Sequence, residues 1–423
     1  MLGRGRKRSR GTVAFECRPN AGASDVFTRK EGRKGNGIML SDSEIRHIRS
    51  RFRIFDHKIY LNSCSQGALS DSVEASFREH LESWHEQGSP WDLWVQKYEE
   101  ARGRIARFIG AEKEEIAIVP SASAGINSVA SAVDFTCRRK VVLGVFEFPT
   151  MGHIWLAQQR RGAKVEFISA RGDRIPAESY TAAVDHETAI VPVTHVCFMN
   201  GFRSDVAGII GLAHSKGALV FMDDYQDCGT RPVNVKAWDV DFYVSGALKY
   251  LLGPSGIAFL YVRRNLIPSL VPTISGWFGQ QNPFAFDVRL HDLASTARRF
   301  EAGTPPIPNI YAAMAGIALL GDIGLEHVES QIRKLAQALI EGARELGFRI
   351  KTPLDSVGPL VVLQSNNVEA VLARLAEQNI ICSGRHDGLR ISFHVHNTLD
   401  DVRAVLKVLK KCSELIVRER QTA

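Results

Sequence analysis

One lysine in apolar surroundings is the residue of this chain best suited to covalent chemistry. Lys249 lies between two segments of strand character, residues 240–244 and 256–262, and its neighbours in the chain are small or apolar. An amine in such surroundings loses hydration, which lowers its pKa. The neutral amine is a nucleophile toward carbonyl groups, so Lys249 is a candidate Schiff-base lysine. The segment alone equally allows a lysine that extends from a strand end into solvent.

A carboxylate and an amide precede this lysine at the end of another apolar segment. Residues 218–223 have the pattern of a strand that ends at Asp223, and Gln226 follows in the next turn. Pyridoxal 5'-phosphate (PLP) needs a buried carboxylate at its pyridine nitrogen, a donor near its phenolic oxygen and a lysine at its aldehyde. Asp223, Gln226 and Lys249 can supply these groups from neighbouring strand ends. A cap or turn role is the alternative for Asp223.

The order and spacing of these motifs resemble the class V aminotransferase family of fold-type I PLP enzymes, which includes cysteine desulfurases, kynureninases and isopenicillin N epimerases. The similarity extends from about Ile59 to the C-terminus. It implies an α/β fold, with a mixed, mostly parallel seven-stranded sheet flanked by helices and a smaller α+β C-terminal domain. The expected parts are a leader at residues 1–38, a segment at 39–62 associated with the small domain, a large PLP-binding domain at 63–300 and the small domain at 301–423.

The cofactor phosphate has a candidate site at the start of a helix. Residues 115–119 resemble a strand, and a turn of small residues then opens a helix. Free N–H groups and the positive end of the helix dipole can bind an anion there, although a serine-rich helix start is most often only a cap. The resemblance implies that Ala122 and Ser123 hold the phosphate, and it also assigns Gly246 to the cofactor site. The segment 298–312 contains the family motif RFEAGT at residues 299–304, which implies a homodimer in which Gly303 and Thr304 reach the partner's phosphate.

The resemblance assigns further residues to the cofactor ring and the substrate. Phe148, in an FPT context like that of kynureninases, is expected to stack on the ring, with a core position as the alternative. Arg390 matches the arginine that binds the substrate α-carboxylate, for which a guanidinium fork is suited. Asn62 lies in the turn expected beside the substrate. Trp277 resembles a kynureninase substrate loop, with ordinary packing as the alternative. Asn200 is a possible substitute for the family asparagine, whose own position is Phe198.

Composition and charge exclude several classes of protein. Of 423 residues 45% are hydrophobic and 23% charged, as in a globular protein, and no apolar run reaches the roughly 18 residues of a membrane span. Seven scattered cysteines and the lack of a C-x-x-C pair favour a reducing cytoplasm and no metal site. Cys64, in the expected substrate turn, is predicted to be structural rather than reactive.

The positive charge of the chain is confined to its first residues. The whole formal excess of +7 comes from residues 1–38, which hold ten Lys/Arg and three Asp/Glu. Such a leader is predicted to be disordered. A basic arm can bind nucleic acid, but no reading motif accompanies it, and no nucleic-acid partner is expected. We interpret Met39 as the true start and the leader as the product of an over-extended gene model.

The predicted reaction takes place at Cα of an amino acid through a Lys249 Schiff base, and an aminotransferase is preferred. The first alternative is a lyase or hydrolase that cuts at Cβ, of the C–S lyase or kynureninase type, and the second is a racemase or epimerase. Persulfide chemistry is disfavoured, because Cys382 lies in a run too short for a long loop. Kynureninase chemistry is weakened by Gln226 and Gln280, where that enzyme has histidines. The non-enzymatic alternative is a PLP-fold binding protein that has lost catalysis.

Overall fold

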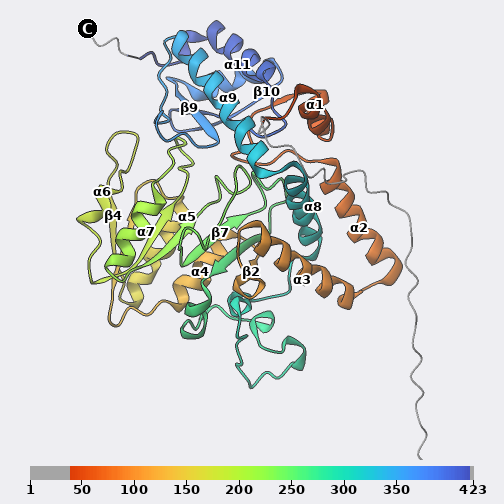
Figure 1. Cartoon of the computed structure of the whole chain (residues 1–423), viewed down its shortest axis with the longest axis vertical. Coiled ribbons are helices and arrows are strands. Elements are labelled where there is room, and N and C mark those ends of the chain that lie inside the picture. The colour runs from red at the N-terminus through yellow and green to blue at the C-terminus, as the bar shows by residue number, and fades with distance from the viewer. Residues whose placement is uncertain (1–38, 420–423) are drawn as a thin grey trace, which may run out of the picture. The chain divides into compact units, whose positions relative to one another are not determined.

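A seven-stranded sheet is the central element of the computed structural model, which describes residues 39–419 (Figure 1). Its strand order is β2-β8-β7-β6-β5-β3-β4, and β8 alone runs opposite to its neighbours β2 and β7. The predicted mixed, mostly parallel sheet is thereby confirmed. The strands are β2 (Ile116–Val119), β3 (Lys140–Gly144), β4 (Lys164–Ile168), β5 (Thr188–Thr194), β6 (Leu219–Asp223), β7 (Phe242–Gly246) and β8 (Ala258–Val262).

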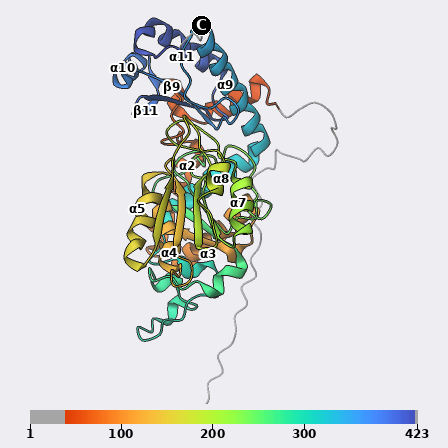
Figure 2. The same cartoon turned by 90° about the vertical axis from the view of Figure 1, so that its left-hand side faces the viewer.

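Helices cover both faces of this sheet because its central strands are apolar on both sides. Neighbouring strand residues such as Phe221 and Met222 belong to different apolar clusters, as the twofold alternation of a strand requires. Figure 2 shows the sheet on edge, between α5 on one side and α7 on the other. The helices around it are α2 (Asp71–Gln87), α3 (Trp91–Phe108), α4 (Ala122–Ala132), α5 (Pro149–Ala157), α6 (Glu178–Thr181), α7 (Val206–Ser215) and α8 (Ile307–Ile323).

A smaller antiparallel sheet forms the C-terminal part, as predicted. Its order is β11-β12-β9. The short strand β1 pairs with β10, and Arg49 of α1 forms an ion pair with Asp401 of α11 at 2.8 Å. The N-terminal helix thus contacts the last long helix. The elements are α1 (Asp42–Ser50), β1 (Ile59–Tyr60), α9 (Leu325–Glu345), β9 (Leu360–Gln364), α10 (Val368–Glu377), β10 (Ile380–Ile381), β11 (Ser383–Arg385), β12 (Gly388–Ser392) and α11 (Leu399–Lys411).

The register of the large sheet brings three strand ends together. Thr194 at the end of β5 pairs with Asp223 at the end of β6, and Asp223 pairs with Val244 of β7. Ligands bind at this carboxyl edge in open α/β sheets. The sheet therefore positions the segments after β5, β6 and β7 around one point.

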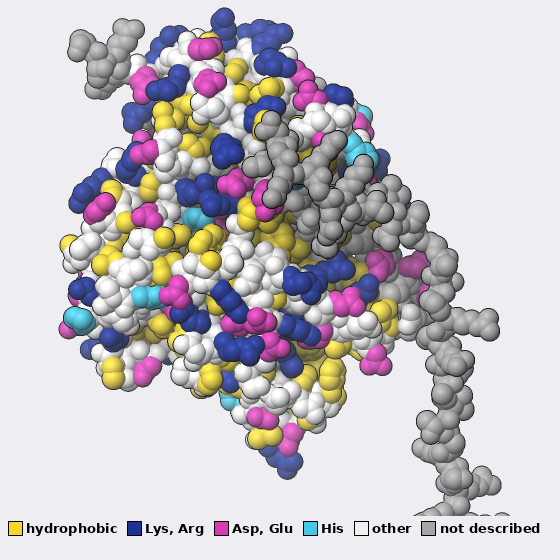
Figure 3. Space-filling view, in the orientation of Figure 1, with side chains coloured by type: hydrophobic (Ala, Val, Ile, Leu, Met, Phe, Trp, Pro, Cys, Tyr) yellow, Lys and Arg dark blue, Asp and Glu magenta, His cyan; other side chains and the backbone are white. Residues whose placement is uncertain are grey.

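The surface and the helices bear on two further predictions. Lys/Arg and Asp/Glu side chains intermingle on the face shown in Figure 3, as the balanced composition after residue 38 predicts.

No single helix within residues 39–419 is long and apolar enough to cross a membrane; α8 and α9 meet that test only as a pair, with a bend of 82° between them. The predicted leader, residues 1–38, lies outside the described residues.

Candidate active site

A cavity of about 240 Å³ lies at the carboxyl edge of the large sheet. Segments that follow β2, β3, β5, β6 and β7 contribute to its wall, which explains why residues far apart in the chain meet here. The predicted site residues that line it are Ala122, Ser123, Phe148, Asp223, Gln226 and Lys249. The remaining predicted residues do not line it: Asn62, Asn200, Gly246, Trp277, Thr304 and Arg390.

Lys249 extends into this cavity from the turn after β7. Its Nζ atom lies 4.4 Å from the centre of the Tyr225 ring and 5.9 Å from that of Phe148. Burial lowers the pKa of Lys249 to about 8, against the opposing effect of Asp223 and Cys64. The amine is therefore neutral in an appreciable fraction of molecules near neutral pH, which an exposed lysine is not.

Asp223 and Gln226 face the same cavity with free acceptor atoms. Asp223 is buried and accepts the Tyr225 N–H at 2.9 Å. Burial raises the pKa of Asp223 to about 6, against the effect of the Tyr225 N–H and Lys249. The Gln226 amide donates to the Cys64 carbonyl at 3.1 Å, whereas its buried Oε1 has no hydrogen-bond partner among the described residues. A buried acceptor without a partner calls for a ligand donor.

Two helices begin at the cavity. Ser121 caps α4 by accepting the Ala124 N–H at 3.1 Å, and Phe148 is the N-cap of α5. The Ser123 and Thr150 hydroxyls lie 3.2 Å apart across the gap between these helices. Free N–H groups at helix starts bind phosphate. Thr150 is a donor that the sequence analysis missed; its position two residues after Phe148 was the available signal.

Arg390 lies beside the cavity rather than in its wall. The residue is 1% exposed; its guanidinium donates to the Phe198 carbonyl at 3.0 Å and to the Ser65 and Ser383 hydroxyls at 2.8 and 2.9 Å. Its Nε–H has no partner among the described residues. Phe198 lines the cavity, so the guanidinium lies directly behind the cavity wall.

The other predicted residues have different surroundings. Asn200 uses its side chain within the chain, donating to the Asp173 carbonyl at 2.7 Å and accepting the Phe202 N–H at 3.1 Å. Trp277 packs against Phe278, Phe284 and Phe286. The remaining positions are as follows: Asn62 pairs with Ser392 as an isolated bridge, Gly246 ends β7, and Gly303 and Thr304 are exposed.

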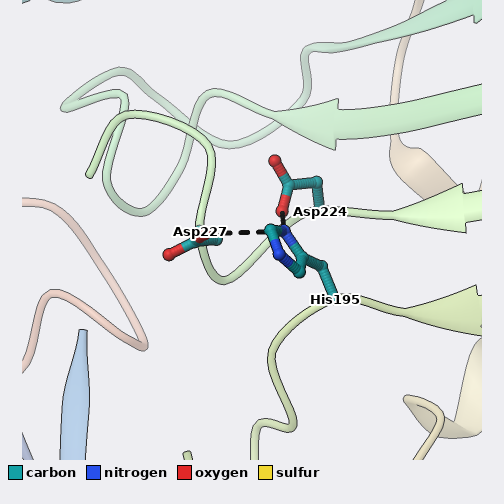
Figure 4. Close-up of side chains that lie close together, drawn as sticks. All are labelled: His195, Asp224 and Asp227. Carbon is teal, nitrogen blue, oxygen red and sulfur yellow. Dashed lines mark hydrogen bonds and ion pairs between the residues drawn. The ribbon is translucent and has the colours of Figure 1, made fainter. Parts of the chain in front are cut away.

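A buried network of His195, Asp224 and Asp227 was not predicted (Figure 4). His195 Nδ1 lies 2.7 Å from Asp224 and 3.5 Å from Asp227, and Arg203 donates to Asp227 at 2.9 Å. Despite burial, Arg203 and His195 lower the pKa of Asp227. The backbone N–H of His195 donates to the Asp223 carbonyl at 2.9 Å, which joins the ends of β5 and β6 beside this network.

The network has the composition of a metal site, but both oxygens of Asp224 and Oδ1 of Asp227 already have hydrogen-bond partners in the protein. Oδ2 of Asp227 has none among the described residues and lies 3.5 Å from Nδ1 of His195. The Tyr243 hydroxyl donates to Asp224 at 2.7 Å, and the Thr230 hydroxyl donates to Asp227 at 2.7 Å. With the Arg203 cation also in contact, the group is better suited to internal charge balance than to a divalent ion.

The donors of the cavity fit PLP. A lysine of lowered pKa suits an aldehyde, and a buried carboxylate suits a protonated ring nitrogen. Oε1 of Gln226, which has no partner among the described residues, is left for a group of a ligand. The paired helix starts suit a phosphate. Each group that the cofactor presents therefore has a counterpart among residues on neighbouring strand ends.

Comparison with known proteins also points to a PLP-dependent family. The family model "Aminotransferase class-V" matches residues 71–405. An uncharacterized aminotransferase of Bacillus subtilis, YcbU, is 34% identical over 344 residues, which are 81% of this chain and 91% of that protein. The apo structure of a cysteine desulfurase from Thermococcus onnurineus superposes with a TM-score of 0.79 at 25% identity, covering 87% of this chain and 98% of that one.

A third similarity concerns the fold. The structure of C-DES with glycine covalently linked to its PLP cofactor superposes with a TM-score of 0.80 at 20% identity, covering 86% of this chain and 98% of that one. The match of the family model to most of the chain carries the assignment. The predictions of family, fold, enzyme and cofactor are confirmed: the chain belongs to the class V aminotransferase family and is a PLP-dependent enzyme.

Proposed function

We propose that the protein is an aminotransferase that acts at Cα of an amino acid, with Lys249 as its catalytic residue. The observation that carries this proposal is the lysine of lowered pKa in one cavity with Asp223 and Gln226. The similarity to YcbU, which is named as an aminotransferase, supports transamination as the preferred reaction.

Each group of the cofactor has a proposed partner in the chain. Lys249 binds the aldehyde, Asp223 the ring nitrogen, and Gln226 the phenolic oxygen, while Phe148 covers the ring. Ala122 and Ser123 at the start of α4 bind the phosphate, and Gly246 lies beneath the site. Bound PLP supplies an electron sink for the electron pair released at Cα.

Proton transfer is the task of the Lys249 amine once the amino group of the substrate has taken its place on the aldehyde. A pKa of about 8 lets the released Nζ accept the proton from Cα within the cavity. Asp223 must be ionised to hold a protonated ring nitrogen. Burial raises the pKa of Asp223, but only to about 6, because the Tyr225 N–H and the nearby Lys249 oppose the rise, so the ionised form predominates at neutral pH.

Substrate recognition is assigned to Arg390. Its guanidinium donates to the Phe198 carbonyl and to the hydroxyls of Ser65 and Ser383. A substrate carboxylate that replaces the two hydroxyls as acceptor would form a bidentate, charge-assisted pair with the guanidinium. Asn62 and Trp277 are proposed to complete the substrate site. Asn200 is retained only as a support of the loop that carries Phe198, because its side chain binds backbone groups.

We propose a cytoplasmic homodimer with shared sites. Gly303 and Thr304 are exposed and lie outside the cavity of their own subunit, so they are available to the phosphate of a partner. Apolar side chains of the preceding loop are exposed as well, including Phe286 and Val288. All described cysteines are free thiols, which suits a reducing compartment.

The alternative is cleavage at Cβ, favoured by the similarity to a cysteine desulfurase. Within this alternative, the persulfide route is disfavoured, because the candidate carrier, Cys382, is partly buried and burial raises the pKa of its thiol. Racemisation, which would use the same residues, is the second alternative. A non-catalytic binding role is weaker, because it does not explain the complete set of Arg390, Asp223 and Lys249.

A screen of amino acids with and without an oxo-acid acceptor tests the proposal. Turnover that depends on the acceptor supports transamination. Release of pyruvate, alanine or sulfide without an acceptor indicates a lyase or hydrolase, and inversion at Cα without either product indicates a racemase. Tight PLP binding with no turnover of any amino acid would support a non-catalytic binding role.

A further inference from the structure

Two aromatic rings lie beside the Lys249 amine, although only one was predicted. Tyr225 is the nearer, at 4.4 Å between Nζ and the ring centre, and Phe148 is at 5.9 Å. Both distances lie within the range in which an aromatic face attracts a cation. Both side chains line the cavity that also holds Asp223.

The two rings approach the end of β6 from opposite sides. Tyr225 rests on β7, where its ring atoms occupy the place that a Cβ atom on Gly246 would need. Phe148 instead packs edge-on against Phe198, beyond the end of β5, with 5.0 Å between ring centres. Because β6 lies between β5 and β7 in the sheet, the space at the end of β6 is flanked by one ring on each side.

We propose that Tyr225 forms the second wall of an aromatic slot, so that the cofactor ring lies between Phe148 and Tyr225. The inference rests on the proposed attachment of PLP to Lys249, because the ring must then extend from Nζ. A planar ring gains stacking on both faces in such a slot. A ring whose nitrogen is protonated also gains a cation–π contact with each wall.

The hydroxyl of Tyr225 fixes this wall to the lysine segment. It forms a hydrogen bond with the backbone of Leu248, the residue before Lys249, and burial raises the pKa of Tyr225 to about 12. The phenol therefore stays neutral over the working range of pH. The lack of a side chain at Gly246 makes room for this wall, because a side chain at that position would displace the Tyr225 ring.

The test is a titration of PLP-free protein with PLP, followed by visible absorbance and circular dichroism. Tyr225→Phe keeps the ring, and its Kd for PLP is expected within about twofold of the natural protein. Tyr225→Ala removes one wall and is expected to raise Kd about tenfold and to change the visible dichroism of the bound cofactor. Phe148→Ala is expected to act in the same direction.

A matched double variant separates stacking from space filling. Tyr225→Ala with Gly246→Ala returns a methyl group to the vacated space without a π face. If this variant recovers the natural Kd for PLP and the natural dichroism, the proposed aromatic slot is overturned. If it still binds PLP weakly, the slot is supported. If Tyr225→Ala does not fold, Tyr225→Leu, which keeps apolar volume, carries the same expectations.

Borohydride reduction with peptide mapping distinguishes this inference from the proposed function. A label on Lys249 together with an unchanged Kd and dichroism in Tyr225→Ala overturns the slot alone. A label elsewhere in the natural protein, or none, overturns the proposed function and the slot with it.

Discussion

The backbone N–H of Thr194 donates to Oε1 of Glu147 at 2.8 Å, which joins the loop carrying Phe148 to the end of the strand beside Asp223. Glu147 is only 8% exposed, and its Oε2 has no hydrogen-bond partner among residues 39–419. Burial raises the pKa of Glu147 to about 8; the Thr194 N–H lowers it and Asp223 raises it further. The carboxyl group therefore stays protonated at neutral pH.

The proton on Glu147 makes stability depend on pH in a defined direction. An unfolded glutamate ionises near pH 4.3, so between about pH 4.3 and 8 the folded state holds a proton that the unfolded state has lost. Stability therefore falls as pH rises through this window. Glu147→Gln keeps an acceptor for Thr194 without the charge. We expect it to match the natural protein near pH 4.5 and to be more stable by up to roughly 5 kcal/mol at pH 8.5.

Urea unfolding of the PLP-free protein over this pH range measures the difference. The control is Glu178→Gln on the exposed surface of α6, for which no pH-dependent difference is expected. A difference between Glu147→Gln and the natural protein that is the same at every pH would contradict a buried, titrating carboxyl.

Replacement of Lys249 is expected to abolish the attachment of PLP while stabilising the empty protein. Its folded pKa of about 8 lies below the ordinary value of a lysine, so the buried charge costs stability below pH 8, and this cost vanishes above about pH 10.4. Lys249→Met keeps the apolar stem. We expect a higher Tm than that of the natural protein at pH 7, no difference near pH 10.5, and no absorbance band near roughly 420 nm after PLP addition. A normal band in this variant would refute the assignment.

The core of the site could be predicted because it follows from local patterns. Apolar strands that end in Asp223 or lead to Lys249 place both groups at the same sheet edge, whatever the details of packing. The mixed sheet flanked by helices and the smaller C-terminal part were instead predicted from the resemblance to the class V aminotransferase family.

Residues whose roles depend on tertiary contacts could not be predicted. Tyr225 has the pattern of a packing residue, and only the structure shows its ring over Gly246. His195 and Asp227 belong to different strand ends, so their pairing has no sequence signature. Asn200 was assigned to the substrate by position in a motif, whereas the structure shows that backbone groups use its side chain.

Arg390 is expected to select substrates by their carboxylate. Arg390→Lys keeps a charge but loses the fork that reaches Phe198, Ser65 and Ser383 together. We expect KM for amino acids to rise about tenfold or more, with KM for the corresponding amino-acid amides nearly unchanged. Measurement of both substrate series, with the Kd for PLP as control, checks this. An equal change in both series would show that Arg390 supports the fold rather than the carboxylate.

The proposed homodimer with shared sites predicts recovery of activity when two defective variants are mixed. Lys249→Met removes the amine of its own site, and Thr304→Ala removes the proposed phosphate contact to the partner's site. At a PLP concentration that leaves Thr304→Ala mostly empty, each variant alone should be nearly inactive. A mixed dimer has one site with an intact Lys249 and an intact Thr304 from the other subunit, so unfolding and refolding the two together should restore roughly a quarter of the natural activity. If Thr304 serves its own subunit, no mixed site is complete, and the mixture should be no more active than its components.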